Sequence, residues 1–217
     1  RQGEDAVHGL AAADLTEGHR VMAPGAFAVR GFAEYEAGLR ARHVILDAAE
    51  RMRIIEDGLA ALAAREGVRV VPDRGLLEEV AGLVEWPVPL LGRIEPSFMD
   101  IPPEVLVLTM RQNQKYLALE TADRRLAERF VDLPPELMRT TMRVNQRYFA
   151  MVKQDGSAAP VFGVVANIEA TDGGAALVAG NERVLRARLS DARFFWDVDR
   201  RQALEDFLPK LDGVVFH

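Results

Sequence analysis

Arginines recur on one arc of a helix predicted near the end of the chain. Turning each residue by about 100° places them within an arc roughly 100° wide. These residues are Arg183, Arg186, Arg193 and Arg200. A row of guanidinium groups can follow a phosphate backbone, which is the chemistry of nucleic-acid binding. The same arc holds Glu182 and Asp197, so the arginines can instead pair with carboxylates on a solvated face. The pattern leaves both interpretations open.

Arg188 is placed differently from the other arginines because it projects into the apolar arc of the same helix. That arc is formed by Val184, Leu185, Leu189, Ala192, Phe195 and Trp196. A buried guanidinium needs a carboxylate or carbonyl partner, or must line a cleft. We therefore expect Arg188 either to be paired within the fold or to face a ligand, and we include it among the candidates for RNA contact.

Two further clusters combine side-chain amides, a cation and an aromatic ring. One holds Asn113, Gln114 and Lys115 followed by a tyrosine, and the other is Asn145, Gln146, Arg147 and Tyr148. Amides, cations and aromatic rings hydrogen-bond to nucleotides and stack on them. The alternative is that each Asn caps a helix C-terminus while the neighbouring polar side chains solvate the last carbonyl groups. Both clusters are candidates for RNA contact, and both can equally be structural.

The two clusters occupy equivalent places in an internal repeat. Residues 98–120 return 32 residues later as 130–152, and twelve of the 23 paired positions are identical. Each copy opens with Asp-x-Pro-Pro-Glu, which suits a helix start, and closes with the alternation typical of a strand. The sequence therefore predicts a duplicated helix–strand unit, spanning 98–129 and 130–161.

Other elements surround this repeat. We expect helices over 32–43, 47–66, 76–84, 177–198 and 200–211, with Asp47 and Glu50 forming a capping box and Gly67 ending the second of them. Short strands are predicted at 18–24, 26–30 and 68–71, an edge strand or extended loop at 86–92, and a return strand at 160–168 after an Asp155-Gly156 turn. Helices and strands without βαβ alternation indicate an α+β fold with a mixed or antiparallel sheet.

The predicted domain organisation has three parts. Residues 1–15 form a lead-in, 16–175 an α+β domain, and 176–217 a long helical segment that leads to a further domain. The first residue is Arg rather than Met, so we expect the chain to be a piece of a longer protein.

Composition excludes several classes of site. The 217 residues include no cysteine, which rules out disulfides and thiolate metal sites. The formal net charge of −6 argues against a generally basic surface, and no apolar run approaches the roughly 20 residues that span a bilayer. The four histidines lack metal-ligand spacing and no glycine-rich loop opens a helix as a P-loop does. We therefore assign no catalytic residue and no metal ligand.

Four stretches of the chain resemble the beta subunit of bacterial glycyl-tRNA synthetase. The first two are Gly18-His-Arg with its following Pro, and Val84-Glu-Trp-Pro87 with Leu91-Gly92. The third is Pro135-Glu136 with the Thr141–Phe149 run, and the fourth joins Val165-Ala-Asn-Ile168 to the 180–195 run. The likeness covers nearly all of residues 16–217. The family has one Pro-Glu…Asn-Gln-Lys-Tyr-Phe unit where this chain has two, and the second copy fits its pattern better.

The resemblance implies an aminoacyl-tRNA synthetase that ligates glycine to its tRNA using ATP and Mg²⁺ in the cytoplasm. It places the catalytic core in a separate alpha subunit of an α2β2 assembly, so no cofactor is expected in this chain. The implied fold is similar to the B3/B4 type of domain in the phenylalanine enzyme. The implied role is tRNA binding, tRNA positioning and subunit assembly; a hydrolytic editing domain and a pure scaffold are the alternatives.

Overall fold

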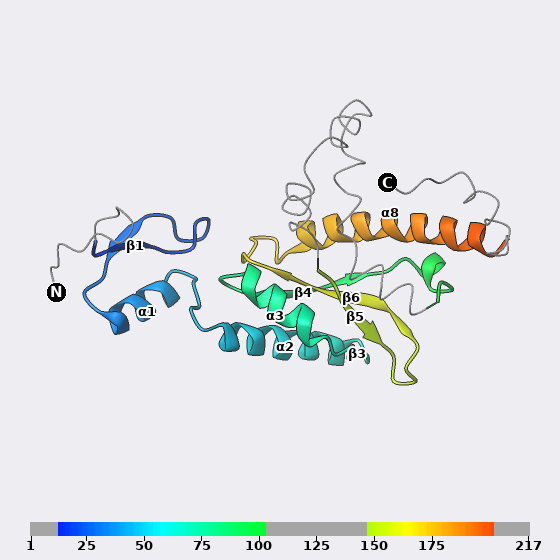
Figure 1. Cartoon of the computed structure of the whole chain (residues 1–217), viewed down its shortest axis with the longest axis horizontal. Coiled ribbons are helices and arrows are strands. Elements are labelled where there is room, and N and C mark those ends of the chain that lie inside the picture. Colours follow the sequence, from blue (N-terminus) through cyan, green and yellow to red (C-terminus); the bar gives the residue numbers. More distant parts are fainter. Residues whose placement is uncertain (1–12, 103–146, 202–217) are drawn as a thin grey trace, which may run out of the picture. The chain divides into compact units, whose positions relative to one another are not determined.

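A computed structural model describes residues 13–102 and 147–201, and within them the fold is α+β, as predicted (Figure 1). The described residues group into two compact units. Unit 1 comprises residues 13–66, 72–90 and 165–175, and unit 2 comprises 67–71, 91–102, 147–164 and 176–201. The predicted domain boundaries, the likeness to a B3/B4 domain and the duplicated helix–strand structure stay predictions. No helix of the described residues is long and apolar enough to cross a membrane.

Unit 1 opens with a small antiparallel sheet and a short helix. Strand β1 (Leu15–Glu17) pairs with β2 (Ala26–Ala28), and helix α1 (Phe32–Arg40) follows. The prediction of a strand at 18–24 was wrong. The His19 imidazole accepts hydrogen bonds from the amides of Val21 and Met22, so this stretch forms a turn instead of a paired strand.

Two packed helices follow in unit 1. Helix α2 (Ala48–Arg65) is capped by the Asp47 carboxylate, which accepts a hydrogen bond from the Ala49 amide. Gly67 follows the helix with a φ of +68°, as expected of a residue that ends a helix. Helix α3 (Arg74–Leu83) packs on α2. Their buried residues are Ile55, Leu59 and Ala63 of α2 and Leu76, Leu77, Val80 and Ala81 of α3.

Most residues of a four-stranded sheet belong to unit 2. Its order is β3 (Arg69–Val70), β5 (Phe149–Val152), β6 (Ala158–Ala166) and β4 (Val88–Arg93). Strand β5 pairs antiparallel with both β3 and β6. The predicted Asp155-Gly156 turn joins β5 to β6, and Gly156 has the positive φ of +85° that such a turn needs. Strand β4 lies at the edge, as the prolines of this segment predict.

Helix α8 (Ala175–Asp199) is the long helix predicted near the end of the chain. Leu185 and Leu189 are each 1% exposed, which confirms the middle of its predicted apolar arc. The prediction that Phe195 lies in the buried arc was wrong. Its side chain is 61% exposed, because no described residue covers the helix there. The 3-10 helix η1 (Pro96–Phe98) ends at the first residue of the repeat. The repeat's predicted helices and the helix over 200–211 lie outside the described residues, apart from Arg200 and Arg201.

Candidate functional site

The arginine face of α8, defined as Arg183, Arg186 and Arg193, begins where the helix meets the segment that leaves β4. The Glu182 carboxylate, one residue before Arg183, accepts a hydrogen bond of 2.7 Å from the Arg93 amide. The Arg186 Nε lies 2.8 Å from the Glu95 Oε2, and both side chains are about half exposed. Segment 93–100 is thus bound to α8 by polar contacts.

Arg193 continues this contact towards the end of η1. Its guanidinium donates to the carbonyl of Ser97 and to the carboxylate of Asp100, and it lies 5.8 Å from the centroid of the Phe98 ring. The carboxylate partners of the arginine face therefore come from segment 95–100. Glu182, which the helical arc suggested as a partner, is engaged with a backbone amide instead.

Arg183 differs from the other two arginines of this face. It is exposed, and its side chain makes no hydrogen bond or ion pair with any residue in 13–102 or 147–201. A guanidinium keeps its charge at any physiological pH and presents five donors. Arg183 is therefore the member of the face that is most accessible to an anionic partner.

Arg188 and Arg147 are both buried rather than presented at the surface. Arg188 is 5% exposed and its guanidinium lies 3.8 Å from the Asp191 carboxylate. Arg188 thus lies on the apolar side of the helix, and of the alternatives left open by the sequence it meets a carboxylate within the fold. Arg147 is 8% exposed at the start of the stretch that becomes β5. Such burial leaves little of either side chain for an outside partner.

Tyr148, the last residue of the second amide cluster, lies in the core of unit 2. It is 1% exposed, and its hydroxyl donates to the Asn181 side-chain oxygen of α8 at 2.9 Å. Its ring packs edge-on against Phe162 with centroids 4.6 Å apart. Burial raises the pKa of the Tyr148 hydroxyl well above its usual value of 10.0. These contacts tie β5 to α8 and favour a structural role for Tyr148.

The remaining members of the two clusters lie outside the described residues. They are Asn113, Gln114, Lys115, Asn145 and Gln146. Their predicted contact with RNA, like that of the arginines, stays a prediction. Among residues 13–102 and 147–201 no group of three or more His, Asp or Glu side chains is placed to hold a metal ion.

Two of the stretches that suggested the family are hydrogen-bonded to each other in unit 1. The Asn167 side-chain oxygen accepts from the backbone amides of Glu85 at 2.7 Å and Trp86 at 2.9 Å. The Trp86 indole donates to the Glu169 carboxylate at 2.8 Å. We call this arrangement the Asn167 clamp. It joins residues more than 80 positions apart in the sequence.

A third stretch that suggested the family, Gly18-His-Arg, also binds backbone groups. The Nδ1 atom of His19 accepts two amides, so the proton of a neutral imidazole resides on Nε2. The His19 amide donates to the Arg42 carbonyl at 2.9 Å. A Cβ on Gly18 would overlap with the side chain of Arg42, which accounts for the glycine at this position.

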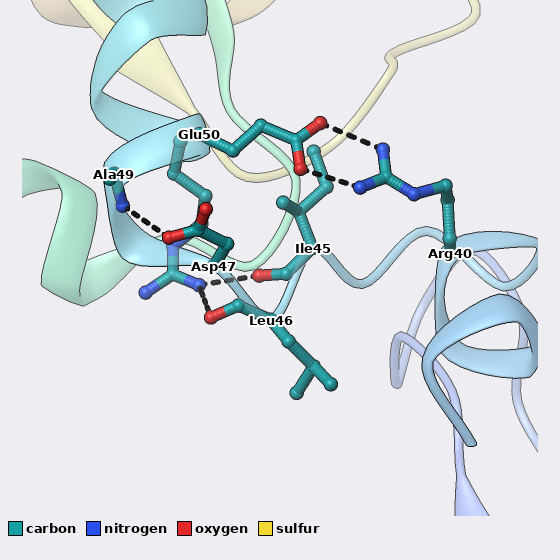
Figure 2. Close-up of polar contacts among 7 residues, drawn as sticks. Arg40, Ile45, Leu46, Asp47, Ala49 and Glu50 are labelled. Carbon is teal, nitrogen blue, oxygen red and sulfur yellow. Dashed lines mark hydrogen bonds and ion pairs between the residues drawn. The ribbon is translucent and has the colours of Figure 1, made fainter. Parts of the chain in front are cut away.

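The junction between α1 and α2 is held by charged side chains (Figure 2). The Arg40 guanidinium donates to both Glu50 carboxylate oxygens, at 2.8 and 2.5 Å. Glu50 therefore pairs with α1 instead of completing the predicted capping box with Asp47. The hydrogen bond from Arg40 lowers the pKa of the Glu50 carboxyl below its ordinary value.

A second arginine binds the same junction through carbonyl groups. Arg51 donates to the carbonyls of Ile45 and Leu46, and its Nε donates to the Ala81 carbonyl near the end of α3 at 2.8 Å. Figure 2 shows the contacts at Ile45 and Leu46 beside the Arg40–Glu50 pair. Sequence reasoning missed Arg51, because nothing in the pattern of a single helix indicates which carbonyls its side chain will reach.

The family model described as glycyl-tRNA synthetase beta subunit matches the chain twice, over residues 4–132 and 125–217. The first match contains repeat unit 98–129 whole, and the second contains unit 130–161 whole.

Several relatives named glycine–tRNA ligase beta subunit are similar to this chain. The one from Phenylobacterium zucineum is 48% identical over 212 residues, which is 97% of this chain and 27% of the relative. The one from Rhodospirillum centenum is 47% identical over 202 residues, covering 93% and 24%. The one from Paracoccus denitrificans is 42% identical over 213 residues, covering 97% and 26%. The chain thus spans about a quarter of the length of these relatives.

Proposed function

The chain belongs to the glycyl-tRNA synthetase beta subunit family, and we propose that it is a noncatalytic part of a glycine–tRNA ligase. The ligase attaches glycine to its tRNA in an ATP-dependent reaction in the cytoplasm. The alpha subunit of an α2β2 assembly supplies the catalytic core with its ATP and Mg²⁺. The present chain binds and positions the tRNA and takes part in subunit assembly.

The observation that carries the tRNA role is the arginine face of α8. Arg183 is exposed on it with no carboxylate partner in the described part of the chain, and Arg186 is half exposed next to it. A phosphate backbone is recognised by guanidinium groups held at a surface. The contacts of Arg186 and Arg193 with segment 95–100 hold the helix and its arginines in place.

The ion pair of Arg186 does not prevent a phosphate contact. Exposed pairs contribute only about 0–1 kcal/mol, so a phosphate can replace the Glu95 carboxylate at small cost. Arg188, by contrast, is 5% exposed and contributes to packing rather than to RNA contact. Within the arginine face the expected order of importance is Arg183 first, then Arg186, and Arg193 last.

A purely structural scaffold is the second candidate, and specific contacts favour it. The side chains of Arg51 and Asn167 bind backbone groups of distant segments, and the His19 imidazole binds two amides of its own turn. Such contacts hold a fold together without requiring any ligand. The scaffold and the tRNA-binding role differ in what they predict for Arg183.

The test is a binding measurement on the intact two-subunit enzyme with glycine tRNA across a salt series. Each lost phosphate contact lowers the slope of log affinity against log salt by about 0.7–0.9. Arg183→Ala is expected to weaken binding and lower the slope by about one contact. The matched control is Arg53→Ala, which removes the same charge from an exposed position on α2. Equal slopes for both variants and the unaltered enzyme would contradict the tRNA contact of Arg183. The structural scaffold would then be the remaining candidate function.

The noncatalytic assignment has its own test. The chain alone is expected to give no glycine-dependent ATP–pyrophosphate exchange, whereas the intact two-subunit enzyme is expected to give it. Exchange by the chain alone would contradict the assignment. Release of the amino acid from a mischarged glycine tRNA by the chain alone would show the editing alternative instead.

A further inference from the structure

Two neighbouring phenylalanines near the end of α8 are exposed. Phe194 and Phe195 are 63% and 61% exposed, and their rings meet edge to face with centroids 5.5 Å apart. We call this pair the aromatic end of α8. Removing exposed aromatic rings from water lowers the free energy, so an exposed pair of this kind indicates a surface on which another segment packs.

Phe195 lies at the edge of an apolar side that the fold already uses, whereas Phe194 lies on the opposite side of the helix, about 20° from Arg183. Leu185 and Leu189, about three and two turns earlier, are each 1% exposed, whereas Phe195 on the edge of the same predicted arc is uncovered. The side chain of Trp196, the next residue after Phe195, is half-buried. The apolar surface of the helix therefore runs further than the residues that cover it in the described part of the chain.

The charges around the pair favour a polypeptide as the occupant. Asp191 and Asp197 lie three residues before and after Phe194, which places both within one helical turn of it. Asp197 is exposed. Asp191 is paired with Arg188, so Asp197 is the carboxylate that repels phosphate here, and nucleic acid fits the arginine face of α8 better than it fits the aromatic end.

The size of the pair favours an occupant on the same polypeptide. An aromatic side chain buries about 150–250 Å² at most, so two of them fall well short of the about 800 Å² that each partner buries in a stable complex of separate proteins. A domain joined covalently to this chain is present at high effective concentration and needs less area. The relatives hold about three quarters of their length outside the matched region, which supplies such a domain.

We propose that the aromatic end of α8 is the docking surface for a part of the beta-subunit polypeptide that lies outside this chain. The occupant presents apolar side chains to Phe194 and Phe195. This inference rests on the family membership and on the exposed pair, and it is independent of the proposed tRNA contact of Arg183.

The experiment places p-benzoylphenylalanine at position 194, and separately at 195, in a full-length beta subunit that carries this sequence. The matched control places it at position 32, where Phe32 is 72% exposed on α1. Irradiation of the beta subunit alone, then with alpha subunit and tRNA, is followed by identification of the crosslinked peptides. The expected result is an intrachain crosslink from positions 194 and 195 to a peptide outside the region matched here. The control at position 32 is expected to give no such product.

Other products would overturn the proposal. A crosslink to the alpha subunit, to a second beta subunit or to tRNA would assign the aromatic end to that partner, and absence of any product would leave it a bare surface. A second measurement is the thermal unfolding midpoint of the full-length beta subunit carrying F194S and F195S together. The midpoint is expected to fall by several degrees while F32S leaves it unchanged; equal midpoints would also contradict the docking.

Discussion

Replacing Asn167 with Ala tests whether the family stretches act as a structural clamp. The substitution removes the oxygen that accepts the amides of Glu85 and Trp86, so both donors lose their partner. An unsatisfied buried donor costs about 1–3 kcal/mol. Glu85 is exposed and water can replace its partner, whereas Trp86 is half-buried. We therefore expect a loss of about 1–2 kcal/mol, or a factor of about 5–30 in the opening equilibrium.

The assay is amide hydrogen exchange, read at Glu85 and Trp86, together with urea unfolding of the chain. Exchange at the Trp86 amide is expected to accelerate by the same factor of about 5–30, because exchange reports local opening. Asn167→Asp retains an acceptor oxygen and is expected to keep most of the protection. Gln154→Ala is the matched control, since its amide only donates to the Gly67 carbonyl at an exposed position. It should change stability by no more than about 0.5 kcal/mol.

Two outcomes would refute this reasoning. If Asn167→Ala left the Trp86 amide as protected as before, the two hydrogen bonds would contribute nothing to local stability. If Asn167→Asp lost as much protection as Asn167→Ala, the acceptor oxygen would not be the group that matters.

Three further predictions concern packing, pH and the repeat. A Cβ at position 92 would overlap with the fully buried ring of Phe162, so Gly92→Ala is expected to cost about 1–3 kcal/mol in urea unfolding, whereas Gly82→Ala, with open space around it, should be neutral or slightly stabilising. Because the pKa of Glu50 is lowered from 4.5, its contribution to stability is present above that pH and is lost as the pH falls through the lower folded value. Arg40→Gln should flatten the stability profile in that acidic range, and an unchanged profile would contradict the pairing. Deleting residues 117–148, one repeat period, joins Tyr116 to Phe149 and is expected to retain cooperative thermal unfolding, whereas deletion of 105–124, which ignores the period, should abolish it.

Local signals in the sequence predicted most of the described elements. Asp47, Gly67 and the Asp155-Gly156 turn act within a few residues of their own position, and each lies where expected. Period and length were enough to place α8, and the prolines of segment 86–92 indicated the edge strand β4. The stretch at 18–24 was misjudged because the contact that decides it, an imidazole accepting two backbone amides, leaves no trace in hydrophobic alternation.

The sequence could not indicate the hydrogen-bond and ion-pair partners of the candidate residues. Arg186 meets Glu95 and Tyr148 meets Asn181, pairs separated by 91 and 33 positions. A helical arc compares residues of one helix only, so it suggested Glu182 and could not indicate Glu95. Phe195 shows the opposite limit, since the apolar pattern predicted burial whereas its side chain is 61% exposed.

The most direct test of the tRNA-positioning role is a footprint of glycine tRNA on the intact two-subunit enzyme, measured by hydrogen exchange along α8. The account predicts that bound tRNA protects the turns around Arg183 and Arg186 and leaves the α2 turn around Arg53 unchanged. Equal exchange along α8 with and without tRNA would contradict it.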